Sequence, residues 1–457
     1  MLNDEWTLDD KLGHKIIVDN VIKTIEDITP PFTLGIYGGW GSGKTSIMKQ
    51  IYYKVGGETK SYLFPFSKSP EKEQINTENQ TIIDSMQDKK NYEAIWFNPW
   101  KHEMEANPLL GLLHEIREHF NLYNKSTSEA KKLAHVTIRG GLDILTNTIK
   151  EMTKIDLSAS HIIKYGESYE NSNFETKSST QNFRLVFESA ITKLLETTKD
   201  KKLIIFIDDL DRCTDQKIIK LLEGIKLYLS TSNCIFIFGM DQSNVINALK
   251  NSNINEEYLD KLFQSVIRIP ISTKYQDFII SNIIKKYFYL ELTTSTLELE
   301  FSKLITDIVE KNPRKIKNFA NSLKFYWDIK SDLDLDLKIF TLFHYLRIHY
   351  EDIFEMIERD YTLFQYLLNT CKKEPANVKI ESYFNTVLEN PIMETVDTNS
   401  NNASEVLNKA QIDNNEKLVM KNTRIKFKAL DSFKNYFADY CSELDISKLP
   451  HYLGVIK

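Results

Sequence analysis

The feature that most constrains the fold is the glycine-rich run Gly38-Gly39-Trp40-Gly41-Ser42-Gly43-Lys44-Thr45, which fits the pattern G-x-x-x-x-G-K-[ST]. An apolar segment from Thr33 to Tyr37 precedes the run, and a helical pattern from Lys44 to about Tyr53 follows it. Glycines allow backbone conformations closed to other residues, so consecutive N–H groups can point inward at phosphate oxygens. The positive end of the following helix favours the same anion. Strand, loop and helix in this order predict a phosphate-binding loop (P-loop) instead of a chance glycine-rich turn.

The side chains of this run have predicted roles in binding a nucleoside triphosphate. Lys44 supplies a mobile positive charge for the β- and γ-phosphates, and Thr45 supplies a hydroxyl group for Mg²⁺. The predicted nucleotide-binding set consists of Gly38, Gly39, Trp40, Gly41, Ser42, Gly43, Lys44, Thr45 and Ser46.

A second pattern places two acids at the end of an apolar segment. Leu203 to Ile207 reads as a buried strand, and Asp208 and Asp209 follow it directly. Ligands of open α/β sheets bind at the carboxyl edge of the strands, where these acids would lie. Asp208 is therefore predicted to hold Mg²⁺ through water, and Asp209 to orient or deprotonate the attacking water. Capping of the following helix is the structural alternative for such a pair.

A third apolar segment, Cys234 to Phe238, leads to Asp241. This side chain could report on the γ-phosphate or cap a helix that begins near Ser243, and the sequence leaves both readings open. ATP is favoured over GTP as the nucleotide. The string Thr153-Lys154-Ile155-Asp156 has the form of a guanine-reading motif, but it lies in a polar stretch before the Asp208 strand and not at a strand end.

Short apolar segments alternate with helical patterns up to about residue 272, which predicts an α/β fold with a parallel sheet flanked by helices. Two further strands are expected at 94–97 and 266–269. The expected helices of this part are 8–28, 108–122, 182–195, 216–229 and one from about 243. An α-helical C-terminal region is expected to follow, with helices at 274–289, 296–310, 313–328 and 335–357.

Three regions are predicted along the chain. Residues 1–272 form the P-loop core, with polar insertions at about 56–91 and 123–180; the second is expected to include some helix between 130 and 154. Residues 273–371 form a helical lid or bundle, and residues 372–457 a polar linker followed by a C-terminal helical segment.

Composition argues against several classes of protein. The 58 basic and 64 acidic residues give a net charge of −6, so a nucleic-acid partner is supported only weakly, by the basic cluster Lys417–Lys434, for which a solvated helix face is the preferred interpretation. Cys213, Cys234, Cys371 and Cys441 form no C-x-x-C pair, which speaks against a zinc knuckle or a disulfide framework. The sequence contains no run of about 20 apolar residues and begins with an acidic segment unlike a secretory signal. A cytoplasmic protein without membrane insertion is predicted.

Several motifs together resemble the KAP family of P-loop NTPases, and the likeness covers roughly residues 8 to 328. The matching segments are Gly39-Trp40-Gly41-Ser42-Gly43-Lys44-Thr45-Ser46, Trp96-Phe97-Asn98-Pro99-Trp100, Ile207-Asp208-Asp209-Leu210-Asp211-Arg212-Cys213, Tyr258-Leu259-Asp260-Lys261-Leu262-Phe263-Gln264 and Asn312-Pro313-Arg314-Lys315-Ile316-Lys317-Asn318-Phe319. The resemblance implies an additional-strand P-loop ATPase core with a helical extension. It also implies phosphate binding by Lys44, magnesium binding by Thr45 and Asp208, and water activation by Asp209.

Bacterial members of the KAP family are linked to phage exclusion and genome conflict, and animal members are membrane scaffolds. Many relatives carry transmembrane helices between the two nucleotide motifs, whereas the corresponding stretch 123–180 is polar here. The resemblance therefore points to a soluble member, with a homo-oligomer and an effector protein encoded nearby as the expected partners.

Residues beyond these motifs are candidates for supporting roles. Three arginines could stabilise charge on the leaving phosphate: Arg212, Arg268 and Arg314. Arg314, in the first turn of a helix after the core, is the preferred one, as a contact from the lid. Trp96 and Trp100 are expected to fill the core, and Asn98 either does the same or forms hydrogen bonds near the phosphates or to Asp208.

These features predict an ATP-binding and ATP-hydrolysing switch that changes conformation or oligomeric state, with ATP and Mg²⁺ as its ligands. Two other functions remain open. One is a small-molecule phosphotransferase, because kinases share the same loop. The other is a nucleotide-dependent scaffold with little turnover.

Overall fold

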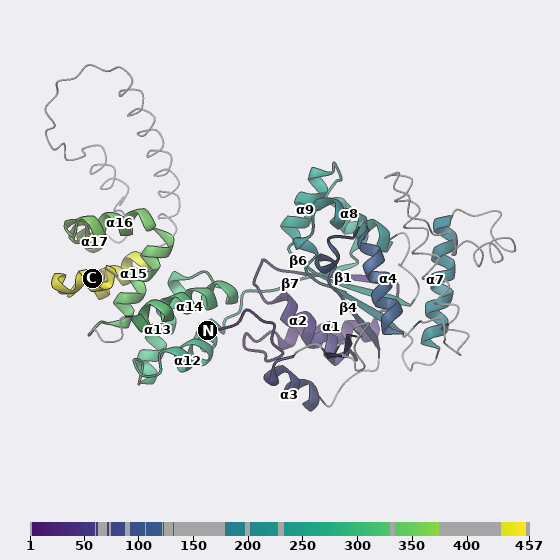
Figure 1. Cartoon of the computed structure of the whole chain (residues 1–457), viewed down its shortest axis with the longest axis horizontal. Helices are drawn as coiled ribbons and strands as arrows, with labels where there is room; N and C mark the ends of the chain where they lie inside the picture. Colours follow the sequence, from purple (N-terminus) through teal and green to yellow (C-terminus); the bar gives the residue numbers. More distant parts are fainter. Residues whose placement is uncertain are drawn as a thin grey trace, which may run out of the picture. The chain divides into compact units, whose positions relative to one another are not determined.

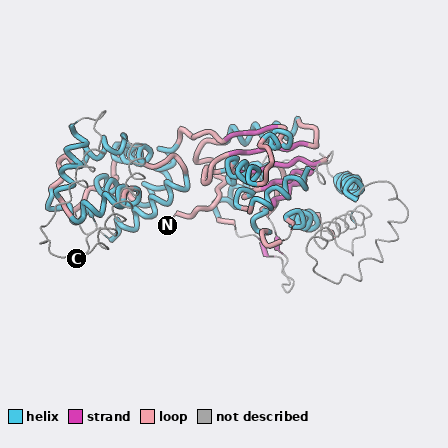
Figure 2. The backbone as a smooth tube through the Cα atoms, turned by 90° about the horizontal axis from the view of Figure 1, so that it is seen from above, coloured by secondary structure: helices cyan, strands magenta, loops and turns pink. Residues whose placement is uncertain are grey.

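The computed structural model describes residues 2–59, 61–62, 71–72, 75–86, 92–105, 107–120, 122, 131, 179–196, 202–226, 233–329, 334–373 and 431–453. The chain divides into two compact units. The sheet unit comprises Glu5–Ser272, and the helical unit comprises Met1–Asp4 together with Thr273–Lys457. In Figure 2 the strands, drawn in magenta, belong to the sheet unit, and the described part of the helical unit consists of helices and loops.

The core of the sheet unit is a five-stranded parallel sheet in the order β4-β5-β6-β1-β7. Its strands are β1 (Phe32–Tyr37), β4 (Glu93–Phe97), β5 (Leu203–Ile207), β6 (Cys234–Met240) and β7 (Ser265–Arg268). All five were predicted from the apolar segments of the sequence, and the predicted α/β fold class is confirmed. A short antiparallel pair, β2 (Ser61–Tyr62) and β3 (Glu71–Lys72), stands apart from this sheet.

Helices cover both faces of the sheet, which explains why its central strands are apolar throughout. Alternate residues of β5 enter two separate cores, with Ile205 in one and Phe206 in the other. The Phe206 face packs on α1 (Lys15–Asp27), α2 (Lys44–Lys54) and α3 (Thr77–Ser85). The Ile205 face packs on α4 (Pro108–His119), α7 (Ser179–Leu195), α8 (Asp215–Gly224), α9 (Gln242–Asn251) and α10 (Glu257–Leu262). Figure 1 shows α1 and α2 on one side of the sheet and α8 and α9 on the other.

Two features near the N-terminus differ from the sequence-based expectation. The predicted helix 8–28 begins only at Lys15, because Gly13 takes a left-handed conformation with φ 74° that interrupts a helix. The polar stretch 56–91 contains α3, whose Asn79 is buried because it bonds the backbone of Leu8 and Trp6. A polar sequence thus forms a packed helix here through contacts with a distant segment.

The helical unit consists of short helices around an aromatic core. They are α11 (Tyr275–Ile279), the π-helical turn η4 (Ile280–Ile284), α12 (Lys285–Tyr287), α13 (Ser295–Ile308), α14 (Pro313–Ile329), α15 (Leu337–His349), α16 (Glu351–Arg359), α17 (Thr362–Lys373), α20 (Asp431–Cys441), the 3₁₀ turn η5 (Ile446–Lys448) and α21 (Leu449–Leu453). The single helix predicted over 335–357 is wrong, because Tyr350 leaves the helical conformation and divides it into α15 and α16. Phe433 and Phe437 of α20 pack against α15, so the C-terminal helices belong to the same core.

Several sequence-based predictions lie outside the described residues. They concern the helix between 130 and 154, the guanine-type string at 153–156, the stretch 374–415 and most of the basic cluster at 417–434.

Candidate functional site

The glycine-rich run forms the connection between β1 and α2 at the carboxyl edge of the sheet. Gly41 and Gly43 have φ angles of 79° and 96°, a left-handed region that side chains with a Cβ rarely adopt. A Cβ atom at Gly38 would approach the Ser42 hydroxyl to 2.5 Å. The loop therefore needs glycine at these positions to bend back over the first turn of α2, as the sequence pattern predicts.

The Lys44 ammonium group is held at this loop. Its Nζ donates hydrogen bonds to the carbonyls of Gly38 and Gly39 at 2.9 and 3.2 Å, and the residue is buried. The positive charge is thus concentrated where the loop amides and the N-terminus of α2 also favour an anion.

Thr45 and Asp208 lie in direct contact although 163 positions separate them in the chain. The Thr45 hydroxyl donates to Asp208 Oδ2 at 2.7 Å. The other oxygen, Oδ1, is buried with no hydrogen-bond partner among the described residues. A buried carboxylate oxygen without a partner is costly, so this atom is placed to accept a ligand such as a cation or its water shell.

The donor set therefore fits a magnesium ion bound with a nucleotide. Thr45 and Asp208 would hold Mg²⁺ through hydroxyl, carboxylate and water oxygens, which are the ligands this cation prefers. When bound, the ion would neutralise phosphate charge during transfer of the γ-phosphate. Gly239 on β6 leaves space beside the Asp208 carboxylate, because a Cβ at this position would lie 3.0 Å from Asp208 Oδ1.

Burial raises the pKa of the Asp208 carboxyl to about 6, and the neighbouring Asp209 charge acts in the same direction. The native state therefore holds a proton on this group more tightly than the unfolded chain does. The contribution of this group to the stability of the folded state is fully present below its ordinary pKa of 3.8. It is lost as the pH rises through the folded-state pKa of about 6.

Replacing Asp208 by asparagine is therefore expected to stabilise the nucleotide-free protein in EDTA. The gain should be about 1–3 kcal/mol above a pH of about 7 and should vanish below about 4. Thermal unfolding across this pH range measures it. Asp211→Asn, a nearby acid outside the contact with Thr45, is the control and should leave the melting temperature unchanged. If Asp208→Asn raised the stability equally at all pH values, the gain would not come from removing the buried charge of Asp208.

Asp209 is held from two sides. It has a left-handed backbone conformation with φ 60° and ψ 26°, which is uncommon for a residue other than glycine. Asn98 Nδ2 donates to its Oδ2 at 2.8 Å, and Arg212 Nε pairs with its Oδ1 at 2.8 Å. The alternative that Asn98 bonds Asp208 is thus corrected: it contacts Asp209, because β4 lies beside β5 and ends level with it. The alternative that Asn98 forms hydrogen bonds near the phosphates stays a prediction.

The other acid and the arginines that were predicted as site residues have different contacts. Asp241 caps α9, since its Oδ1 accepts hydrogen bonds from the backbone and hydroxyl of Ser243. Arg268 donates to Gln242 at 2.9 Å. Arg314 lies in the first turn of α14 in the helical unit, where its guanidinium pairs with Asp4. Of the three candidate arginines, Arg212 is the one in contact with an acid of this site.

The two tryptophans of the strand-end motif behave differently. Trp96 fills the core as predicted, stacked on Phe206 at 5.8 Å. Trp100 is 48% exposed, so its predicted place in the core is wrong. Together with Trp40 of the phosphate loop it flanks Arg212, whose Cζ lies 5.3 Å from the Trp100 ring and 5.8 Å from the Trp40 ring. Sequence reasoning could not find this contact, because the three residues come from segments that are far apart in the chain.

The class of the protein follows from the parallel sheet with this strand order, the phosphate loop after β1 and the paired acids after β5: it has the core of a P-loop NTPase. The particular family follows from a comparison with protein-family models. The model of the KAP family P-loop domain matches residues 14–327, more than half of the chain, and the chain therefore belongs to the KAP family.

A curated relative aligns with part of the chain. The chain is 28% identical over 170 residues to the uncharacterized protein MJ0182 of Methanocaldococcus jannaschii, an alignment that covers 31% of this chain and 87% of that protein. Within the described residues, no helix combines the length and the apolar character that crossing a bilayer requires. The stretch in which KAP relatives carry transmembrane helices lies mostly outside those residues.

Proposed function

We propose that this protein binds ATP with Mg²⁺, hydrolyses it, and uses the cycle as a conformational or oligomeric switch. The observation that carries the proposal is the Thr45–Asp208 contact beside the Lys44 loop, with Asp209 next to it. Phosphoryl transfer requires positioned positive charge and a residue that orients the nucleophile. These residues supply both.

This geometry supports the following proposed roles within the site. The loop amides and Lys44 would hold the β- and γ-phosphates, and Thr45 and Asp208 would hold the magnesium ion. Asp209 would orient the attacking water or accept its proton. Arg314 stays a prediction as a contact from the helical unit to the leaving phosphate, and Arg314→Ala in the hydrolysis assay measures its contribution.

Release of free phosphate from ATP, with no acceptor added, tests the proposal. A hydrolase should release it in a magnesium-dependent way, whereas a small-molecule phosphotransferase should depend on its acceptor. Tight nucleotide binding without release would support the scaffold alternative. GTP measured in parallel tests the preference for ATP.

Asn98 is proposed as a positioning residue for Asp209. In the Asn98→Ala variant Asp209 loses one of its two holding contacts and samples other rotamers, so kcat should fall about tenfold with little change in KM. Asn98 also caps the 3₁₀ turn η1 (Pro99–His102), since its Oδ1 accepts a hydrogen bond from Trp100 N. Asn107→Ala, which removes a similar cap from α4 away from the acids, is the matched control. A higher kcat in Asn98→Ala would contradict the positioning role, because it would show that the contact with Asn98 keeps Asp209 from its catalytic position.

The biological setting rests on the family resemblance alone. A role in bacterial defence against phage or other foreign DNA, a homo-oligomeric form, an effector partner and a cytoplasmic location are part of the same proposal. Mass photometry of the full chain with and without ATP tests the oligomeric part.

A further inference from the structure

Arg212 joins three segments of the sheet unit at the carboxyl edge of the sheet. It ends the 3₁₀ turn η2 (Leu210–Arg212), and its Nε pairs with Asp209 Oδ1 at 2.8 Å. Its Cζ lies 5.8 Å from the ring of Trp40 in the phosphate loop and 5.3 Å from the ring of Trp100 in η1. Aromatic rings within about 6 Å attract a guanidinium group. The phosphate loop, η1 and η2 therefore meet at one side chain.

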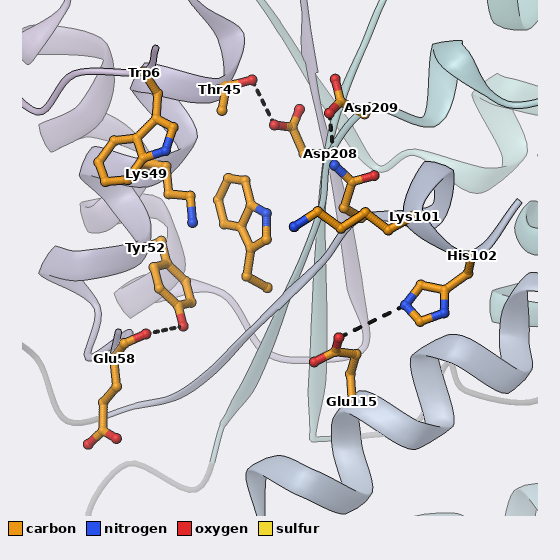
Figure 3. Close-up of a pocket in the computed structure, with 12 residues that line it drawn as sticks. Trp6, Thr45, Lys49, Tyr52, Glu58, Lys101, His102, Glu115, Asp208 and Asp209 are labelled. Carbon is orange, nitrogen blue, oxygen red and sulfur yellow. Dashed lines mark hydrogen bonds and ion pairs between the residues drawn. The ribbon is translucent and has the colours of Figure 1, made fainter. Parts of the chain in front are cut away.

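The ion pair of Arg212 with Asp209 is partly withdrawn from water. The side chain of Arg212 is 32% exposed and that of Asp209 21%, whereas Trp40 is 62% exposed. A partly buried ion pair is screened less than an exposed one, so Arg212 can hold Asp209 in one orientation. Figure 3 shows Asp209 beside Asp208 at one end of a pocket of about 390 Å³. Without its contacts the Asp209 side chain would have space to turn.

The other contact of Asp209 leads to the same pair of tryptophans. Asn98 donates to Asp209 through Nδ2, and its Oδ1 accepts a hydrogen bond from the backbone of Trp100. Both side chains that hold Asp209 are thus in contact with Trp100. Only Arg212 also contacts Trp40, so it provides the connection from the phosphate loop to Asp209.

The bonds of Lys44 give a reason for the phosphate loop to change when nucleotide binds. Lys44 Nζ donates to the carbonyls of Gly38 and Gly39, and the second carbonyl belongs to the peptide group that leads into Trp40. An ammonium group has only three N–H donors, so contact with two phosphate groups takes at least one donor away from these carbonyls. We therefore expect the backbone before Trp40 to move on nucleotide binding.

We propose that Arg212 is a positioning residue that couples the phosphate loop to Asp209. When Lys44 bonds the phosphates, Trp40 shifts against the guanidinium group, and Arg212 then fixes Asp209 toward the attacking water. In this role Arg212 acts only through Asp209, unlike an arginine that contacts the leaving phosphate directly. The inference rests on the proposed function, because it concerns the same nucleotide and the same acid.

Phosphate release by variants of the full chain tests this role. Arg212→Met keeps the length of the side chain and removes the pair with Asp209. We expect kcat to fall about 10- to 100-fold, with the nucleotide dissociation constant within a few-fold of wild type. Arg212→Lys, which keeps the charge without the planar group, should show a smaller loss. Arg359→Met is the matched control, because it removes an exposed ion pair with Glu355 on α16 and should retain wild-type turnover.

The double variant Arg212→Met/Asp209→Asn distinguishes action through Asp209 from direct contact with phosphate. In single-turnover hydrolysis it should be no slower than Asp209→Asn alone, because the effects of residues that act as a unit do not add. A further loss of about tenfold or more would overturn the proposal. Wild-type kcat in Arg212→Met and Arg212→Lys, with melting temperatures that show both to be folded, would also overturn it.

Tryptophan fluorescence tests the first step, from the loop to Trp40. Titration with magnesium ADP should change the emission of the wild type, and the amplitude at saturation should be largely lost in Trp40→Phe. An unchanged amplitude in Trp40→Phe, or no change in a wild type that binds nucleotide by calorimetry, would contradict the coupling. Calorimetry keeps the tests apart. Absence of nucleotide binding contradicts the proposed function, whereas binding and hydrolysis that do not depend on Arg212 contradict only the coupling.

Discussion

A Lys44→Ala variant is expected to bind magnesium ATP at least about 100-fold more weakly than the wild type. Charged hydrogen bonds contribute about 1.5–3 kcal/mol each, and Lys44 is predicted to contact two phosphate groups. The same ammonium group bonds the Gly38 and Gly39 carbonyls, so its loss also loosens the loop that presents the backbone amides. Isothermal titration calorimetry with a slowly hydrolysed ATP analogue gives the dissociation constants.

The control for this experiment is Lys54→Ala at the end of the same helix. Lys54 pairs with Asp19 at 2.8 Å and is remote from the loop in sequence. It should bind nucleotide as the wild type does. If Lys44→Ala bound nucleotide with wild-type affinity, the phosphate loop would not be part of the binding site. The main physical argument for nucleotide binding would then be wrong.

An Asp209→Asn variant is expected to keep nucleotide affinity within a few-fold and to lose about 10²–10⁴-fold in kcat, the range that a positioned acid or base contributes. The substitution keeps the size of the side chain and removes the charge that would orient or deprotonate water. Binding and turnover should therefore separate in this variant, unlike in Lys44→Ala. Steady-state release of phosphate together with calorimetry on the same preparation provides both quantities.

Asp211→Asn is the matched control for Asp209, because it changes an acid two positions along the same loop. It should retain wild-type turnover. If Asp209→Asn hydrolyses ATP as fast as the wild type, another group activates the water, and the contacts from Asn98 and Arg212 have only a structural role.

Much of the fold could be predicted from local patterns in the sequence. The central strands β5 and β6 are buried along their whole length. A parallel sheet covered on both faces produces such short continuous apolar runs, which are easy to recognise. The phosphate loop was equally clear, because residues other than glycine rarely adopt the backbone angles of Gly41 and Gly43. Helix boundaries were less certain, since the break at Tyr350 has no glycine or proline to mark it.

The sequence by itself determined the type of sheet, the phosphate loop and the presence of two acids at a strand end, because each of these depends on residues close together in the chain. Only the tertiary structure decided that Asn98 and Arg212 hold Asp209, that Asp241 caps a helix, and that Lys49 is buried beside Trp96 near the magnesium residues. These contacts join segments that meet only when the strands pair and the helices pack. Their partners depend on register and strand order, which no local pattern specifies.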